Sequence, residues 1–88
     1  MEYRLQVSAE AVQALTKLEK AAAWRITQRL SWLAQNIGNI KPEPLKGEYS
    51  GFYKYRIGDY RAIYFISHPE QTIFVRSLGH RSNVYKMK

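Results

Sequence analysis

The sequence predicts an α+β protein with an N-terminal strand, a helical hairpin and then a three-stranded antiparallel meander that completes one sheet. Two observations predict this order of elements. A short segment of alternating polarity leads into a long run of good helix formers that contains neither Gly nor Pro. Beyond two closely spaced prolines, the chain is rich in aromatic and β-branched residues, which favour strands. At 88 residues we expect one domain, spanning residues 1–88.

The first half of the chain is expected to form a strand and two helices. Residues 3–7 alternate apolar and polar side chains, as a half-buried strand does, and Ser8 follows as a helix N-cap. The helix-forming run 9–37 divides into two helices, because Glu19 and Lys20 interrupt its apolar stripe. We expect this stripe to lie in the core; it comprises Val12, Leu15, Ala22, Ile26, Leu30 and Leu33.

The helical half should end near Gly38. Glycine is favoured at the C′ position that follows a helix, and the prolines at 42 and 44 then prevent helix continuation. Three β-prone segments come after them and are expected to form strands, at residues 51–57, 60–67 and 72–78.

A two-residue turn at Gly58-Asp59 is expected to join the first two of these strands and to fix their register. In that register Arg56 lies opposite Arg61, and Lys54 lies on the same sheet face because side chains alternate along a strand. The other face is expected to pack on the helices and carries Tyr55, Ile57, Tyr60, Ala62 and Tyr64.

The chain is strongly basic, with a formal net charge of +7. Residues 46–88 carry eight basic and three acidic side chains, against six and four in residues 1–45. This surplus favours nucleic acid, an anionic membrane or an acidic protein as partner, and the alternative is a small domain that is simply basic. No apolar run approaches the roughly 20 residues that cross a bilayer, and no signal peptide is evident, so we expect a cytoplasmic protein.

Basic side chains gather at one end of the predicted sheet. Arg56 and Arg61, directly opposite, repel each other by up to about 1 kcal/mol, which a bound anion would relieve; alternatively both extend into water at almost no cost. If the last strands are neighbours, the final antiparallel strand brings Gly79, His80 and Arg81 toward the same hairpin. With an aromatic residue nearby, the group would suit the phosphate of an unstacked nucleotide.

The sequence does not favour a metal or a cofactor. Its carboxylates are scattered, it has two histidines, and it has no cysteine, so neither a two-metal nor a zinc site is expected. Cleavage of a phosphodiester without metal would use the 2′-hydroxyl of RNA as nucleophile and leave a 2′,3′-cyclic phosphate. Lys, Arg, His and Tyr can supply the base, the acid and the stabilising charge.

Three short segments carry a family resemblance. They are residues 45–47, LKG, residues 51–64, GFYKYRIGDYRAIY, and residues 75–85, VRSLGHRSNVY. These segments resemble the RelE/ParE superfamily of toxin-antitoxin toxins, and the expected elements extend the likeness over essentially the whole chain. RelE-type members are ribosome-dependent endoribonucleases, or mRNA interferases, that cut mRNA in the 30S decoding site amid the rRNA. The resemblance therefore implies translation inhibition, a cognate RelB-like antitoxin with an extended, often acidic segment, and a higher-order toxin-antitoxin complex without membrane contact.

The resemblance also implies a catalytic set, namely Lys54, Arg56, Arg61, His80, Arg81 and Tyr85. The first three match family residues that hold and activate the scissile phosphate, and Tyr85 matches a tyrosine that stacks on or orients the substrate. The general acid is Arg81 or His80, and histidine is the better proton donor near pH 7. Arg56 stands where the best-known family pattern has lysine, and segment 79–85 is shorter than in that pattern.

Two other functions fit the same sequence. One is a ParE-like toxin that inhibits DNA gyrase by protein contact and cleaves nothing. The other is a non-catalytic nucleic-acid-binding domain, for which the basic sheet face suffices. Trp24 and Trp32 lie off the apolar stripe, so we expect them to be partly exposed, and they are candidates for an antitoxin-binding groove.

Overall fold

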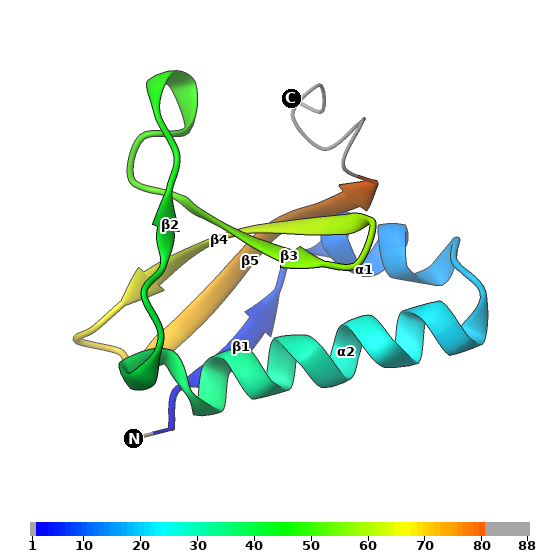
Figure 1. The fold of residues 1–88 in the computed structure, drawn as a ribbon, viewed down its shortest axis with the longest axis horizontal. Helices are drawn as coiled ribbons and strands as arrows, with labels where there is room; N and C mark the ends of the chain where they lie inside the picture. The colour runs from blue at the N-terminus through cyan, green and yellow to red at the C-terminus, as the bar shows by residue number, and fades with distance from the viewer. Residues whose placement is uncertain (1, 81–88) are drawn as a thin grey trace.

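Residues 2–80 of the chain are described by a computed structural model, in which five strands form one mixed sheet in the order β1-β5-β4-β3-β2 (Figure 1). The elements along the chain are β1 (Arg4–Val7), α1 (Ala9–Thr16), α2 (Lys20–Gln35), the short 3-10 helix η1 (Ile37–Asn39), β2 (Glu43–Pro44), the 3-10 helix η2 (Gly47–Tyr49), β3 (Tyr53–Ile57), β4 (Tyr60–Ser67) and β5 (Thr72–His80). The predicted strand, helical hairpin and antiparallel meander are thus confirmed, and β2 is an addition.

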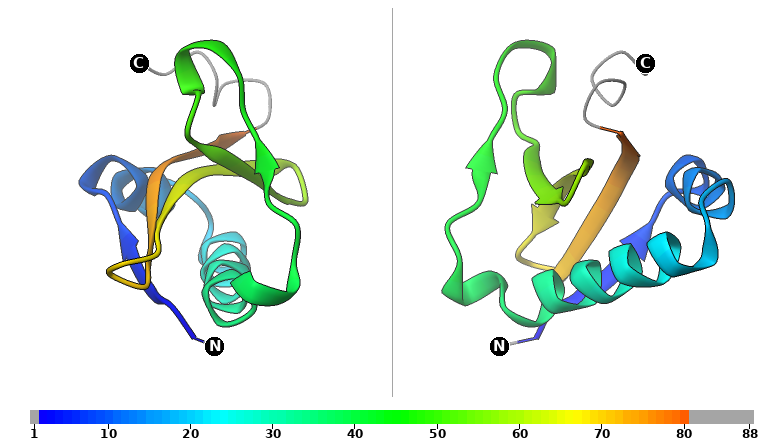
Figure 2. Two further views of the ribbon diagram at one scale, coloured as in Figure 1. Left: turned by 90° about the vertical axis from the view of Figure 1, so that its left-hand side faces the viewer. Right: turned by 45° about the vertical axis from the view of Figure 1, so that its right-hand side comes forward.

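The sheet has helices on one face only. Strands β3, β4 and β5 pair antiparallel, whereas β1 runs parallel to β5. Figure 2 shows α1 and α2 together on one side of the sheet, with η2 at the far side of the molecule. Within residues 2–80, neither helix is both long enough and apolar enough to cross a bilayer.

The start of α1 is tied to the sheet by Ser8. As predicted, the Ser8 side chain caps the helix: its hydroxyl oxygen accepts a hydrogen bond from the backbone N–H of Ala11 at 3.0 Å. The same hydroxyl donates to the backbone carbonyl of Arg76, on β5, at 2.6 Å. One side chain therefore fixes both the first turn of α1 and its position against β5.

The helices break where predicted, but α2 does not end in the expected way. Helix α2 ends at Gln35, and Asn36 caps it: the backbone N–H of Asn36 donates to the Leu33 and Trp32 carbonyls, and its side-chain amide donates to Trp32 at 2.8 Å. These bonds satisfy the Trp32 and Leu33 carbonyls, and the Ala34 carbonyl accepts from the backbone N–H of Tyr3 at 3.0 Å, so the helix ends without a left-handed C′ residue. Gly38 instead lies within η1 and is not among the glycines with positive φ, so its predicted role was wrong.

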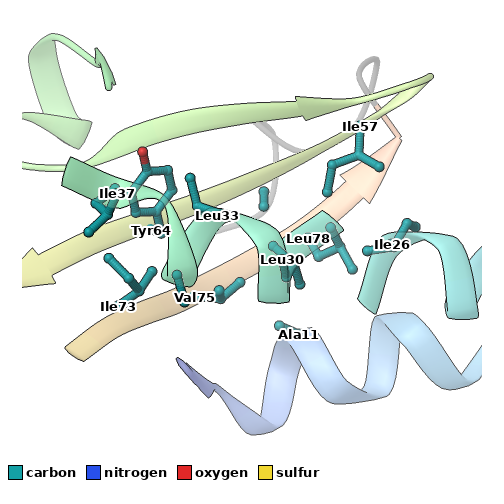
Figure 3. Close-up of a cluster of buried hydrophobic side chains, with 12 residues drawn as sticks. Ala11, Ile26, Leu30, Leu33, Ile37, Ile57, Tyr64, Ile73, Val75 and Leu78 are labelled. Carbon is teal, nitrogen blue, oxygen red and sulfur yellow. The ribbon is translucent and has the colours of Figure 1, made fainter. Parts of the chain in front are cut away.

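The core lies between the two helices and the sheet. Figure 3 shows side chains of α1, α2 and β5 gathered in one cluster, among them Ala11, Leu30 and Leu78. The buried hydrophobic cluster of the described residues comprises Ala11, Ile26, Leu30, Leu33, Ala34, Ile37, Ile57, Ala62, Tyr64, Ile73, Val75 and Leu78.

The predicted stripe is correct for Ile26, Leu30 and Leu33 of α2, whereas Ala22 is half-buried and outside the core cluster, and the stripe is shifted in α1. Val12 is 45% exposed, whereas its neighbour Ala11 is fully buried. The bond from Ser8 to the Arg76 carbonyl sets the rotation of this short helix, and that rotation turns Ala11 rather than Val12 toward β5. Leu15 packs against the edge of the core, as predicted.

The tyrosine-rich face of the hairpin packs on the helices, as predicted. Ile57, Ala62 and Tyr64 are buried, and Tyr55 and Tyr60 pack against the cluster at its border. Burial raises the pKa of Tyr64 far above its ordinary value of 10, and burial also raises the pKa of Tyr55, although the Arg29 charge partly lowers it. The burial of Ile57, Ala62 and Tyr64 makes this the core side of the hairpin, opposite the charged face described next.

Candidate functional site

Three cations lie together on the sheet face that the helices leave uncovered. The β3–β4 register is the one predicted: Arg56 pairs with Arg61, and Lys54 pairs with Ile63 one position along the same face. Gly58 supplies the turn, with φ of 60°. Lys54, Arg56 and Arg61 therefore form one surface, called here the cationic face.

The cationic face combines exposure with incomplete hydrogen bonding. Arg56 is exposed, and Lys54 and Arg61 are half-buried. The Nε atom of Arg61 is buried and has no hydrogen-bond partner. A buried donor without a partner costs about 1–3 kcal/mol. An anion bound to this guanidinium would supply the missing acceptor and remove that cost.

The last strand returns to the hairpin, as predicted for sequential strands. Gly79 pairs with Arg61 and His80 pairs with Tyr60, so the end of β5 lies beside the β3–β4 turn (Figure 1). The rings of His80 and Tyr60 meet edge to face, with centroids 5.9 Å apart. Because the register places His80 on the side of Tyr60, its ring lies on the helix side of the sheet and not on the cationic face.

A β-bulge in β5 causes this placement. Tyr64 pairs with Val75 and Ile63 with Ser77, so Arg76 is an extra residue between two regular stretches. Uninterrupted alternation would have put His80 on the same face as Arg61. The roles of His80, Arg81 and Tyr85 remain predictions; the last two residues lie outside the described part of the chain.

An acidic residue that the sequence did not reveal lies opposite Lys54. The edge strand β2 pairs with β3, and its Glu43 is the cross-strand partner of Lys54. In the sequence, the prolines at 42 and 44 indicate only the end of the helical half, but an edge strand tolerates proline because one side of it needs no hydrogen bonds. Glu43 thus brings a carboxylate to the border of the cationic face.

Trp24 and Trp32 are exposed on α2, as predicted. Their exposed fractions are 67% and 39%, and the Arg29 guanidinium carbon lies 4.9 Å from the centroid of the Trp32 ring. Their part in antitoxin binding stays a prediction.

The fold is that of RelE-like toxins. The chain is similar to a chain of the toxin-antitoxin complex RelBE2 from Mycobacterium tuberculosis, with 23% identity and a TM-score of 0.83 over 93% of this chain and 94% of that one. It is similar to a chain of the archaeal RelE–RelB complex from Pyrococcus horikoshii, with 26% identity and a TM-score of 0.73 over 96% and 100% of the two chains. The isolated RelE toxin of E. coli is 25% identical, with a TM-score of 0.71 over 96% and 92%.

The sequence places the chain in a family as well. No match was found among curated proteins. The family model described as the ParE toxin of the type II toxin-antitoxin system parDE matches residues 5–85. The chain therefore belongs to this family and is a type II toxin of the RelE/ParE superfamily, which confirms the resemblance predicted from the sequence.

Proposed function

We propose that this toxin is a ribosome-dependent endoribonuclease that cleaves mRNA in the decoding site without a metal or a cofactor. The observation that carries the proposal is the cross-strand pair of Arg56 and Arg61, with Lys54 on the same uncovered sheet face. Structure alone does not require two arginines in this relation. Three converging cations are suited to an RNA phosphate, whose charge increases as the phosphodiester reacts.

The proposed reaction is an internal transfer within the RNA. The ribose 2′-oxygen attacks the adjacent phosphorus and loses its proton to a base, while the bond from phosphorus to the 5′-oxygen breaks and that oxygen receives a proton from the acid. The products are a 2′,3′-cyclic phosphate and a 5′-hydroxyl. Lys54, Arg56 and Arg61 stabilise the extra negative charge, Arg81 supplies the acid, since the His80 ring lies on the helix side of the sheet, and Tyr85 orients the nucleotide.

We also propose that a RelB-like antitoxin holds the toxin inactive in a higher-order complex in the cytoplasm. Support comes from the similar structures, two of which are complexes of RelE-type toxins with their antitoxins. An extended acidic segment would complement the net charge of +7, and the exposed Trp24 and Trp32 offer apolar anchors on the helix side.

The nuclease proposal is tested by expressing the toxin without antitoxin and mapping mRNA ends by primer extension. We expect growth arrest and cuts within codons of translated messages. Replacing Arg61 by Ala should lower cleavage by about 100-fold or more, the loss that follows removal of one transition-state donor. Arg25→Ala, which removes an exposed arginine from α2, is the matched control and should cleave like the wild type.

A second function is favoured by the family match itself. The matching family is that of ParE toxins, and a ParE-like chain would inhibit DNA gyrase by protein contact. Intact message together with gyrase-linked DNA damage would support this function and contradict the nuclease. Absence of any toxicity would favour a non-catalytic nucleic-acid-binding domain.

A further inference from the structure

The sheet face without α-helices carries an aromatic cluster next to the cationic face, with Ile63 and Ser77 buried between the two. The rings of Phe65 and Phe74, paired across β4 and β5, are stacked with centroids 4.8 Å apart and an interplanar angle of 12°. Phe52 meets Phe65 edge to face at 5.6 Å. Phe65 remains 38% exposed, and none of the three rings belongs to the buried core of the described residues. The cluster is therefore a partly open aromatic surface.

Arg76 extends over this cluster because of the β-bulge. Its guanidinium carbon lies 5.7 Å from the ring centroid of Phe52 and 6.0 Å from that of Tyr49. Arg76 lines two hollows, one of about 150 Å³ beside Phe52 and Tyr49 and one of about 220 Å³ beside Phe65 and Phe74. Bulges commonly re-aim one side chain out of the regular pattern, and here the side chain is a cation set among aromatic rings.

Cross-strand packing explains why the two rings pair, but not why they are partly exposed beside an arginine. Aromatic pairs stabilise a sheet by about 0.2–1 kcal/mol, which explains why Phe65 and Phe74 meet. It does not explain why they stay partly open, on the face without helices, with an arginine beside them. Exposed rings combined with cations are the features that bind single-stranded nucleic acid, since every base has a face that can stack.

We propose that Phe65, Phe74 and Arg76 form a nucleotide subsite, in which one base of single-stranded RNA stacks on Phe65 and Arg76 binds a neighbouring phosphate. The inference rests on the proposed function, because the same RNA strand would continue to the cationic face. Phe65 lies four residues from Arg61 along β4, a distance of about 13 Å at the usual rise per residue. An RNA strand that spans both sites would be held by a base stacked on Phe65 and by its scissile phosphate at the cationic face.

RNA is the favoured occupant on grounds of charge. Arg76, Lys54, Arg56 and Arg61 all belong to this one sheet face, and the chain carries a net charge of +7. An apolar peptide would leave the Arg76 guanidinium buried without an anion, which is unfavourable.

The test measures binding of the full-length toxin to a fluorescent single-stranded RNA by anisotropy. The RNA carries 2′-O-methyl groups throughout, so it cannot be cleaved, and a second probe of equal length has the same backbone but no bases. Stacking is worth enough that Phe65→Leu should weaken binding of the intact RNA at least about fivefold and leave the abasic probe unaffected. Phe65→Tyr keeps the ring and should bind like the wild type.

Arg76 has a different expected signature. Arg76→Gln should weaken both probes and reduce the slope of log affinity against log salt by about 0.7, the value for one phosphate contact on a single strand. Phe65→Leu should leave that slope unchanged.

Three results would overturn the subsite: no measurable binding by the wild type, equal losses for intact and abasic RNA in Phe65→Leu, or no loss for either. The readout is independent of catalysis. If the toxin binds the probes as described but cuts no message in a translating extract, the nuclease proposal fails and the subsite stands. If cleavage occurs and Phe65→Leu has no effect on binding, the subsite alone fails.

Discussion

Removing one arginine of the Arg56–Arg61 pair should make the toxin more stable while reducing its activity. The two residues are direct cross-strand partners, and opposing side chains in an antiparallel pair begin with their Cβ atoms about 5 Å apart. Two unit charges about 6 Å apart repel by about 0.7 kcal/mol in water. Favourable cross-strand side-chain pairs contribute about 0.2–1 kcal/mol, which is the same size, and like charges act in the opposite direction. Arg56→Gln should therefore raise the free energy of unfolding by roughly 0.5 kcal/mol.

Urea unfolding followed by circular dichroism measures this gain at low and high salt. Salt of about 1 M shortens the screening length to about 3 Å, so the advantage of Arg56→Gln should largely disappear there. Arg25→Gln removes an exposed arginine from α2 and is the control for net charge. If Arg56→Gln is no more stable than the wild type at low salt, or if Arg25→Gln gains as much, the pair does not store repulsion and our reason for expecting an anion between the strands is wrong.

Two further predictions concern the scaffold. Burial raises the pKa of Tyr64 in the folded state, so the contribution of Tyr64 to the free energy of unfolding is fully present below pH 10. Above pH 10 the unfolded chain releases a proton that the native state keeps. Stability should therefore fall by up to about 1.4 kcal/mol per pH unit there, and Tyr64→Phe should make urea unfolding less steeply dependent on pH between about 9 and 11; an unchanged slope would refute this. Ser8→Ala removes both the α1 cap and the bond to the Arg76 carbonyl, so it should lower the free energy of unfolding by about 1–2 kcal/mol, and a loss within about 0.3 kcal/mol would show that neither bond matters.

The features that could be predicted from the sequence are those set by local chemistry. The Gly58-Asp59 turn permits one tight hairpin, and that hairpin alone brings Arg56 opposite Arg61 and aligns Lys54 with them. The break between α1 and α2 followed from the interrupted apolar stripe, and the Ser8 cap from its residue type. Each depends on interactions within a few residues, so the sequence is sufficient.

The errors arose where distant contacts decide the structure. The rotation of α1, which buries Ala11 instead of Val12, depends on a bond from Ser8 to a carbonyl on β5. The bulge at Arg76 has no glycine or proline to indicate it, yet it moves His80 to the helix side and brings Arg76 to the aromatic cluster. Arg76 has only Phe74 as an aromatic neighbour in the sequence, so its contacts with Phe52 and Tyr49 could not be predicted.

The central claim is that Lys54, Arg56 and Arg61 hold an RNA phosphate during cleavage. The most direct measurement is the chemistry of the RNA ends formed when purified toxin is added to a translating extract. We expect 2′,3′-cyclic phosphate and 5′-hydroxyl ends at positions within codons, formed by the wild type and by Arg25→Ala but about 100-fold less by Arg61→Ala. Ends bearing 5′-phosphate, cleavage that survives Arg61→Ala, or intact message alongside inhibited gyrase would contradict it.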